Sequence, residues 1–271
     1  MFPKIILVDK IEGCRSAVED IKRCKKVSVD LEGTNLCRAG TICLIQMRGL
    51  SQNGNTPIYL FDIVALGKTA FEEGGLRSIL ENGWFEKIMF DCRGDADALF
   101  HLYGVRLYGV YDLQVLHTLM FSTHNDMYLK GLKKVLEDFF SSTISDPYHL
   151  NSVLFELKQV KESGKVIFDP AKGGSVTVWE NRPLPQTLRK YAALDVQFLG
   201  TVSETWNSIS NCYYSIAVKY ISDMRVQMAI GNFQPSAGRY KVFRDFDTRL
   251  EQYCEITSGE THPNSWENRT C

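Results

Sequence analysis

Apolar residues follow two different spacings along this chain, and the two spacings alternate. Short runs rich in β-branched and aromatic residues predict strands, which we expect at residues 4–9, 26–32, 42–47, 57–63 and 87–91, with one more near Val110. Stretches in which apolar residues recur every three or four positions predict helices at residues 13–24, 74–82, 95–103, 112–120, 129–140, 154–163 and 186–209. The strands between residues 26 and 63 follow one another as in an antiparallel meander, whereas later strands are reached through helices. This order predicts an α/β fold in which a mixed sheet, an antiparallel meander plus parallel strands, is flanked by helices.

Two parts of the chain depart from this alternation. Residues 141–185 form a long connection with only a short helix, and because such connections are often functional, we expect it to border an active cleft. Beyond about residue 232 the chain becomes polar, and it begins there with the linker-like sequence Gln-Pro-Ser-Ala-Gly. We therefore expect a main domain over residues 1–210, a helix over 211–232 that packs on or beside it, and a linker with a poorly ordered tail over 233–271.

The composition suits a soluble globular protein but identifies no function. The 271 residues are 44% hydrophobic, enough to bury a sizeable core, and no apolar stretch reaches the length of a membrane span. Lys plus Arg (31) nearly equals Asp plus Glu (32), so affinity for nucleic acid would need local basic patches or carboxylates neutralised by metal ions. The eight cysteines contain no C-x-x-C pair, which argues against a zinc site or disulfide framework and favours a reducing compartment, cytoplasmic or nuclear.

Acidic residues at informative spacings mark the candidate chemistry. Side chains alternate across a strand, so Asp30 and Glu32 share one face of the predicted strand, while Val27, Val29 and Leu31 face the other way. Tyr191 and Asp195 are four residues apart in a helical stretch, which places the phenol and the carboxylate on one side of the helix. Several hard oxygen ligands of this kind are what a site for two divalent cations beside a polyanionic substrate needs.

Neighbouring residues have simpler structural explanations. Asp95, in DCRGDADAL, is a further candidate ligand, and Asp97 competes with it from a different side of the same helix. Asp112 is expected to cap the helix that follows it, because an aspartate at a helix start accepts backbone N–H bonds. A lone D-x-E or Y-x-x-x-D is common, so the motifs gain weight only from occurring together and in order.

Basic and small residues near these motifs are interpreted in the same way. Arg93 is a candidate phosphate contact, but an ion-paired arginine is the default. The basic clusters within residues 22–26 and 130–134 are candidates for tracking a nucleic-acid backbone, although charge on a solvated helix face is more usual. The glycines and serine at 173–175 are expected to form a tight turn, and Leu36 is a candidate wedge against a terminal base.

The order of the motifs, DLEG, then DCRGDADAL, then YAALDV, resembles that of the DEDDy 3′-5′ exonucleases of the ribonuclease D-like superfamily. The accessory segments GTICLIQM, GVYDLQVL, LKGLKKVLEDFF and RPLPQTLRKYAALDV resemble the branch that includes Egalitarian and its eukaryotic relatives. The resemblance covers about residues 4–210 and implies a ribonuclease H-like exonuclease domain. One departure concerns a histidine that relatives often carry just before the DCR-type sequence. This chain has Phe90 and Asp91 there, which bears on the fit of the substrate.

The resemblance implies a site and an activity. Its catalytic residues would be Asp30, Glu32, Asp95, Tyr191 and Asp195, of which the four carboxylates would hold two ions, Mg²⁺ or Mn²⁺. Asp30 would bridge the ions, Glu32 and Asp195 would complete the site of the ion that activates water, Asp95 would hold the second ion mainly through waters, and Tyr191 would orient the attacking water. Nucleoside 5′-monophosphates would then be released from the 3′ ends of single-stranded RNA or DNA, with RNA favoured by analogy. The alternative is a catalytically inactive adaptor that keeps the exonuclease fold and binds RNA or protein partners.

Overall fold

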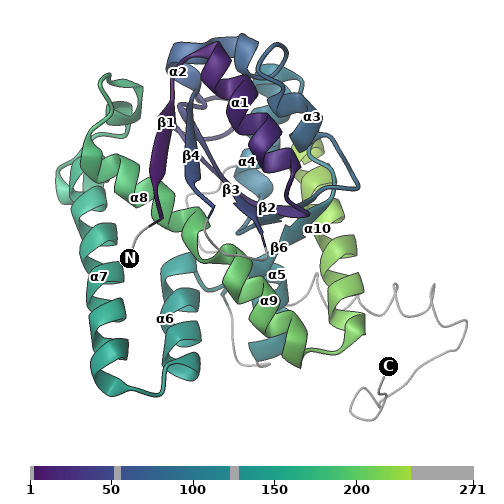
Figure 1. Cartoon of the computed structure of the whole chain (residues 1–271), viewed down its shortest axis with the longest axis vertical. Helices are drawn as coiled ribbons and strands as arrows, with labels where there is room; N and C mark the ends of the chain where they lie inside the picture. The colour runs from purple at the N-terminus through teal and green to yellow at the C-terminus, as the bar shows by residue number, and fades with distance from the viewer. Residues whose placement is uncertain (1–2, 52–55, 123–127, 233–271) are drawn as a thin grey trace, which may run out of the picture.

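A single six-stranded sheet organises the described part of the chain, which comprises residues 3–51, 56–122 and 128–232 of a computed structural model (Figure 1). Its strands are β1 (Ile5–Val8), β2 (Lys26–Glu32), β3 (Leu44–Leu50), β4 (Ile58–Asp62), β5 (Glu86–Met89) and β6 (Val110–Asp112), in the spatial order β1-β4-β3-β2-β5-β6. β2, β3 and β4 pair antiparallel, whereas β1 is parallel to β4, β5 to β2 and β6 to β5. The predicted α/β mixed sheet, an antiparallel meander with added parallel strands, is therefore confirmed.

Helices flank this sheet and connect its strands. They are α1 (Ile11–Lys22), α2 (Ile63–Leu66), α3 (Leu76–Leu80), α4 (Arg93–Tyr103), α5 (Leu113–Phe121), α6 (Leu132–Thr143), α7 (Pro147–Phe168), α8 (Gln186–Gln197), α9 (Leu199–Ile209) and α10 (Cys212–Asn232), with short 3-10 helices η1 (Gly67–Ala70), η2 (Pro170–Lys172) and η3 (Val176–Glu180). α1, α3 and α4 share a core with one face of the sheet, and α8 shares another core with the opposite face. α6 and α7 form a helical hairpin that projects beyond the sheet (Figure 1).

Two helix predictions are wrong in their extent. The connection over residues 141–185 does not hold only a short helix at 154–163, because α7 is 22 residues long. Its start carries a signal, since Asp146 caps the helix by accepting from backbone N–H groups and Pro147 occupies the first turn. The predicted helix at 186–209 is two helices that meet at Phe198, whose backbone (φ −108°, ψ −9°) departs from α-helical geometry.

The alternation of side chains along β2 assigns its two faces to different cores. Val27, Val29 and Leu31 are buried with α1, α3 and α4. Asp30 and Glu32 point to the other face, where α8 packs on strands β2, β3 and β4. The helix that carries Tyr191 and Asp195 therefore lies over the strand that carries the first acidic pair.

α10 closes the far end of the sheet and packs on α4, α5 and β6. The predicted division into residues 1–210, 211–232 and 233–271 stays a prediction, and the last of these segments lies outside the described residues. Among the residues that the structure describes, five cysteines are free thiols: Cys14, Cys24, Cys37, Cys43 and Cys92. Cys212 is disulfide-bonded, which the spread of cysteines along the sequence does not predict. None of the helices in the described part of the chain combines the length and hydropathy that a membrane span requires.

Candidate active site

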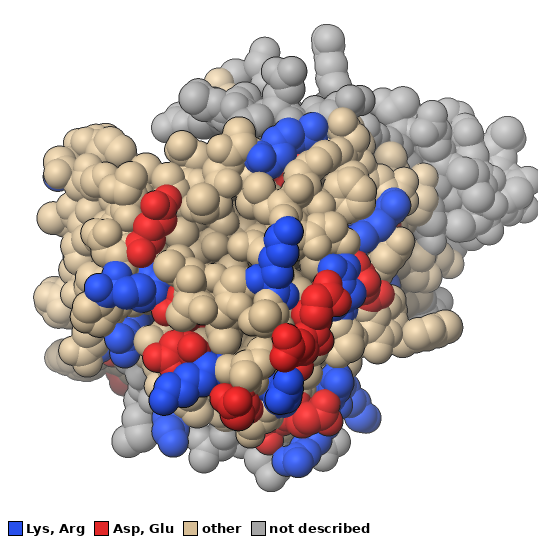
Figure 2. Space-filling model, turned by 90° about the horizontal axis from the view of Figure 1, so that it is seen from above, with Lys and Arg blue, Asp and Glu red and all other residues tan. Residues whose placement is uncertain are grey.

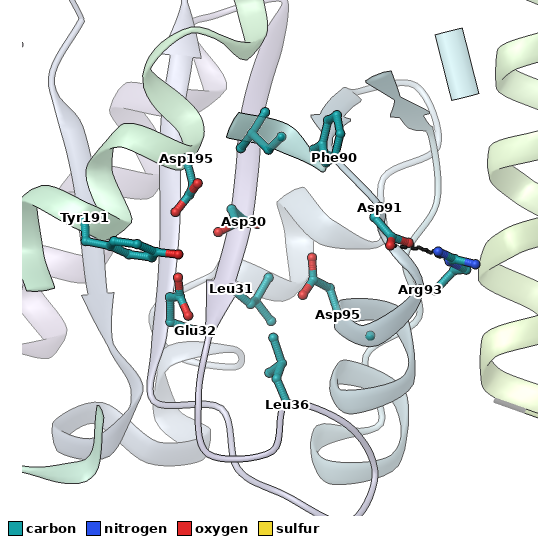
Figure 3. Close-up of a pocket in the computed structure, with 12 residues that line it drawn as sticks. Asp30, Leu31, Glu32, Leu36, Phe90, Asp91, Arg93, Asp95, Tyr191 and Asp195 are labelled. Carbon is teal, nitrogen blue, oxygen red and sulfur yellow. Dashed lines mark hydrogen bonds and ion pairs between the residues drawn. The ribbon is translucent and has the colours of Figure 1, made fainter. Parts of the chain in front are cut away.

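A pocket of about 360 Å³ opens beside the ends of β2 and β5, and its lining includes all five predicted site residues (Figure 3). Asp30 and Glu32 reach it from β2, Asp95 from the first turn of α4, and Tyr191 and Asp195 from α8. Segments separated by as many as 165 positions in the sequence thus meet in one cavity because β2 lies between β3 and β5 and is covered by α8.

Three of the carboxylates form a tight group. One oxygen each of Asp30, Glu32 and Asp195 lies within 4.8 Å of the others. In Figure 3 the hydroxyl of Tyr191 points toward Glu32, while Asp95 points into the same pocket from the opposite wall. Hard oxygen donors at such separations fit a divalent cation.

The pKa values of the four carboxyl groups are all raised. Burial is the main cause for Asp30, Glu32 and Asp95, and repulsion from neighbouring carboxylates adds to it. Burial also raises the pKa of Asp195, although the ammonium of Lys161 acts in the opposite direction. Burial and mutual repulsion make the ionised forms of these carboxyl groups unfavourable. A cation that binds among them would stabilise the ionised forms.

These raised pKa values predict a pH-dependent stability in the absence of metal. A carboxyl whose pKa is higher in the folded than in the unfolded chain stabilises the fold below its unfolded pKa, and this contribution is lost as the pH rises through the folded pKa. With ordinary values of 3.8 for Asp30 and 4.5 for Glu32, the loss begins near these values and grows as the pH rises further. The Glu32→Gln variant has one fewer such group, so its stability is expected to rise relative to that of the wild type as the pH increases above the ordinary Glu value of 4.5. Urea denaturation in EDTA measures this difference, and a difference that does not change with pH would contradict the prediction.

The competition between Asp95 and Asp97 is resolved by packing. Asp97 is fully buried and accepts hydrogen bonds from the backbone N–H (2.6 Å) and the Nε (2.8 Å) of Arg38. The same guanidinium donates to the carbonyls of Ala229 and Ile230, so Asp97 ties the segment after β2 to α4 and α10. Asp95 is the aspartate of this helix that lines the pocket.

Asp112 caps α5 as expected, and it also shapes the pocket. Its carboxylate accepts from the backbone N–H of Gln114 (2.9 Å). It further accepts from the N–H groups of Asp91 (2.9 Å) and Cys92 (3.2 Å), and it is ion-paired with Arg225 of α10. Asp91 has a left-handed backbone (φ 58°), and these bonds hold it there at the start of α4.

Arg93 and the turn at residues 173–175 behave as the sequence predicts. Arg93 is ion-paired with Asp91, with nitrogen to oxygen distances of 2.5 and 2.7 Å. Phe90, which stands where relatives often have histidine, lines the pocket together with Leu36. Residues 173–175 form the expected tight turn, with Gly173 in a left-handed conformation (φ 85°).

The basic clusters are largely neutralised by neighbouring acids. In the first cluster Lys22 pairs with Glu19, Arg23 with Asp20 and Lys26 with Glu86. In the second, Lys130 and Lys134 pair with Asp138, and Lys133 pairs with Glu137 and Glu162. Figure 2 shows a face on which blue and red side chains alternate instead of gathering by sign. These ion pairs favour the interpretation of both clusters as charge on solvated helix faces.

Lys161 is the functional candidate that sequence reasoning missed. It lies on α7, is only 4% exposed, and its ammonium is ion-paired with Asp195. Nothing in the local sequence distinguishes it from the exposed Lys158 one turn earlier. Its position follows from the packing of α7 on α8, which the hydrophobic spacing does not reveal.

Comparisons with known proteins show which family and which folds this chain is similar to. A protein-family model described as 3′-5′ exonuclease matches residues 5–207. The piRNA biogenesis protein EXD1 of Mus musculus is 33% identical over 185 residues, which cover 68% of this chain and 29% of that protein. Its Homo sapiens counterpart is also 33% identical over 185 residues, covering 68% of this chain and 32% of that protein. The chain thus spans about a third of the length of these curated relatives.

Solved structures share the fold. The RNase D of Trypanosoma brucei superposes with a TM-score of 0.70 at 23% identity, covering 91% of this chain and 80% of that one. Its complex with RNA U12 gives a TM-score of 0.70 at 21% identity and covers 100% of this chain and 92% of that one. Escherichia coli RNase D gives a TM-score of 0.59 at 14% identity, with 86% and 58% covered. The expected ribonuclease H-like fold is therefore confirmed.

Proposed function

The chain belongs to the 3′-5′ exonuclease family, and on that premise we propose that it is a metal-dependent hydrolase that shortens single-stranded nucleic acid from the 3′ end. The observation that carries the proposal is the convergence of four carboxylates and one tyrosine, from β2, α4 and α8, on a single pocket. The products would be nucleoside 5′-monophosphates.

The residues of the pocket suit two divalent cations. Asp30, Glu32 and Asp195 would hold one ion, and Asp95 would hold a second that shares Asp30. Bound Mg²⁺ or Mn²⁺ would supply activation of water and stabilisation of the charge that develops on the leaving oxygen. The protein contributes by keeping these oxygens together on a strand and two helices, where little rearrangement is needed.

Tyr191 would orient the attacking water. Its ring is held by edge-to-face contact with Phe168 (centroids 5.0 Å apart) and by Trp179 (6.2 Å), so the hydroxyl is directed into the pocket (Figure 3). Burial, followed by the charges of Asp195 and Glu32, raises the pKa of the phenol. The phenol therefore stays protonated at neutral pH and is available to donate a hydrogen bond.

The substrate is proposed to be RNA in preference to DNA. The Trypanosoma brucei RNase D, which has the same fold, is known in complex with RNA U12, and the relatives EXD1 are piRNA biogenesis proteins. Leu36 and Phe90 add apolar surface to the acidic pocket, which suits the terminal base of a strand whose phosphate faces the carboxylates.

A second candidate function is a non-catalytic adaptor that binds RNA or protein partners. One observation favours it, namely that the acidic group already contains a buried cation, the ammonium of Lys161. A site whose charge is balanced internally has less need of metal ions. The intact set of carboxylates favours the enzyme.

Matched RNA and DNA oligonucleotides of one sequence distinguish the two functions. With a 5′ label and Mg²⁺ or Mn²⁺, the enzyme is expected to produce a ladder of products that shorten from the 3′ end, and a 3′ label is expected to appear at once as a mononucleotide. EDTA is expected to stop both reactions, because the carboxylates alone offer no electrophilic stabilisation. Binding of the oligonucleotide without any shortening would support the adaptor and exclude the enzyme.

A further inference from the structure

Helix α7 approaches α8 unusually closely beside the acidic group. Gly164 makes this approach possible, because a Cβ at that position would collide with the ring of Tyr191. Lys161 lies three residues earlier on α7, on the same side of the helix. The packing that seats Gly164 against the ring therefore also brings the side chain of Lys161 to the carboxylates.

The ammonium of Lys161 is buried and contacts two residues that line the pocket. Its side chain is 5% exposed, and it is ion-paired with Oδ1 of Asp195, whose side chain is 10% exposed. It also lies 3.9 Å from the centroid of the Tyr191 ring, in a cation–π contact. Burying an ammonium costs free energy unless such partners compensate for the lost water. The buried position of Lys161 is therefore tolerated because Asp195 and the Tyr191 ring contact its ammonium.

The charge of Lys161 acts on the whole acidic group. Burial raises the pKa values of Asp30, Glu32 and Asp195, and Lys161 opposes this effect at each of them. The lysine thus serves these carboxylates in the way that a bound cation would.

We propose that Lys161 is a built-in counter-cation of the metal site. Its ammonium is ion-paired with Asp195 in the metal-free protein and must move away from that carboxylate when a divalent cation binds. The inference rests on the proposed function, because it concerns the same carboxylates. The Lys161 ammonium and a divalent ion would both bind the single carboxylate of Asp195. Because both are positively charged, they repel each other strongly at a separation of a few ångströms. The four-carbon stem of lysine is flexible enough for the ammonium to swing away. Lys161 consequently lowers the affinity of the site for metal and keeps the carboxylates together without it.

Metal affinity tests this role directly. Lys161→Met removes the charge while keeping an apolar stem of similar length, and Lys158→Met removes the same charge from an exposed position of the same helix. Isothermal titration of each full-length protein with Mn²⁺ is expected to give tighter binding for Lys161→Met, by on the order of tenfold, and no change for Lys158→Met. Lys161→Arg, which keeps the charge, is expected to bind Mn²⁺ as weakly as the wild type.

The direction of the change separates this role from a merely structural one. A lysine needed only for folding would, when replaced, loosen the pocket and weaken Mn²⁺ binding. Unchanged or weaker binding by a Lys161→Met protein with wild-type circular dichroism would overturn the inference, and Lys161→Gln repeats the test should that variant fail to fold. Tighter binding without cleavage by any of these proteins would refute the proposed exonuclease activity and leave the counter-cation in place. Normal cleavage by the wild type, together with unchanged Mn²⁺ affinity of Lys161→Met, would support the exonuclease activity and refute the counter-cation.

Discussion

Asp30→Asn is expected to abolish shortening of RNA from the 3′ end, with a fall in rate of at least about 1,000-fold. Asp30 lies between Asp195 and Asp95 in the acidic pocket (Figure 3). Its charge contributes to the raised pKa values of Asp95 and Glu32, and the charge of Asp195 contributes to the raised pKa of Asp30. As the proposed shared ligand of both ions, it contributes several kcal/mol of charge stabilisation, and each 1.4 kcal/mol or so corresponds to a factor of ten in rate. Single-turnover assays with a 5′-labelled oligonucleotide and Mn²⁺ measure the loss.

Stability measurements distinguish this loss from unfolding. Burial raises the pKa of Asp30, so its ionised form is unfavourable in the folded protein without metal. The neutral amide of Asp30→Asn is therefore expected to leave the melting temperature in EDTA unchanged or higher. Asp9→Asn, an exposed change of the same kind, is the matched control and is expected to affect neither property. Retention of full activity by Asp30→Asn would show that another residue bridges the ions.

Asp112→Ala is expected to lower the free energy of unfolding by about 3–5 kcal/mol, the range found when one partner of a buried ion pair is removed. The carboxylate is fully buried and accepts from the backbone N–H groups of Asp91, Cys92 and Gln114. It also pairs with Arg225, which is 7% exposed and would lose its carboxylate partner inside the protein. Urea denaturation at neutral pH measures the change.

The capping role alone does not account for an effect of that size. Asp146→Ala removes an exposed aspartate that caps α7 through backbone N–H groups, and this variant is expected to cost about 1 kcal/mol. An equally small cost for Asp112→Ala would show that its bonds to Asp91, Cys92 and Arg225 contribute little. Because those bonds hold the start of α4, Asp112→Ala is also expected to displace Asp95 and slow cleavage under conditions where the variant remains folded.

The acidic residues of the pocket were predictable to different degrees. Asp30 and Glu32 follow from the two-residue period of a strand, and Tyr191 and Asp195 from the turn of a helix, so local geometry alone places each pair on one face. Only the resemblance to a family favours Asp95 over Asp97. The structure gives the physical reason, since Arg38 binds Asp97 in a separate contact between α4 and α10.

Elements with weak or interrupted patterns were harder to predict. The hydrophobic spacing does not predict the full length of α7, because much of the helix is exposed. Asp146 and Pro147 nevertheless mark its start. The hydrophobic spacing does not predict the break at Phe198, because α8 and α9 are both rich in apolar residues. In the structure the ring of Phe198 packs against that of Phe140.

Local sequence by itself determined which side chains share a strand or helix face, because the periods of two and of about 3.6 residues are properties of the backbone. It thereby determined the mixed sheet, the two acidic pairs and the motifs that resemble an exonuclease. Only the tertiary structure decided that carboxylates from β2 and α8 come within 4.8 Å of one another and that Lys161 joins them. Those distances depend on how α7, α8 and the sheet pack together, and packing is a property of surfaces that come from distant parts of the chain.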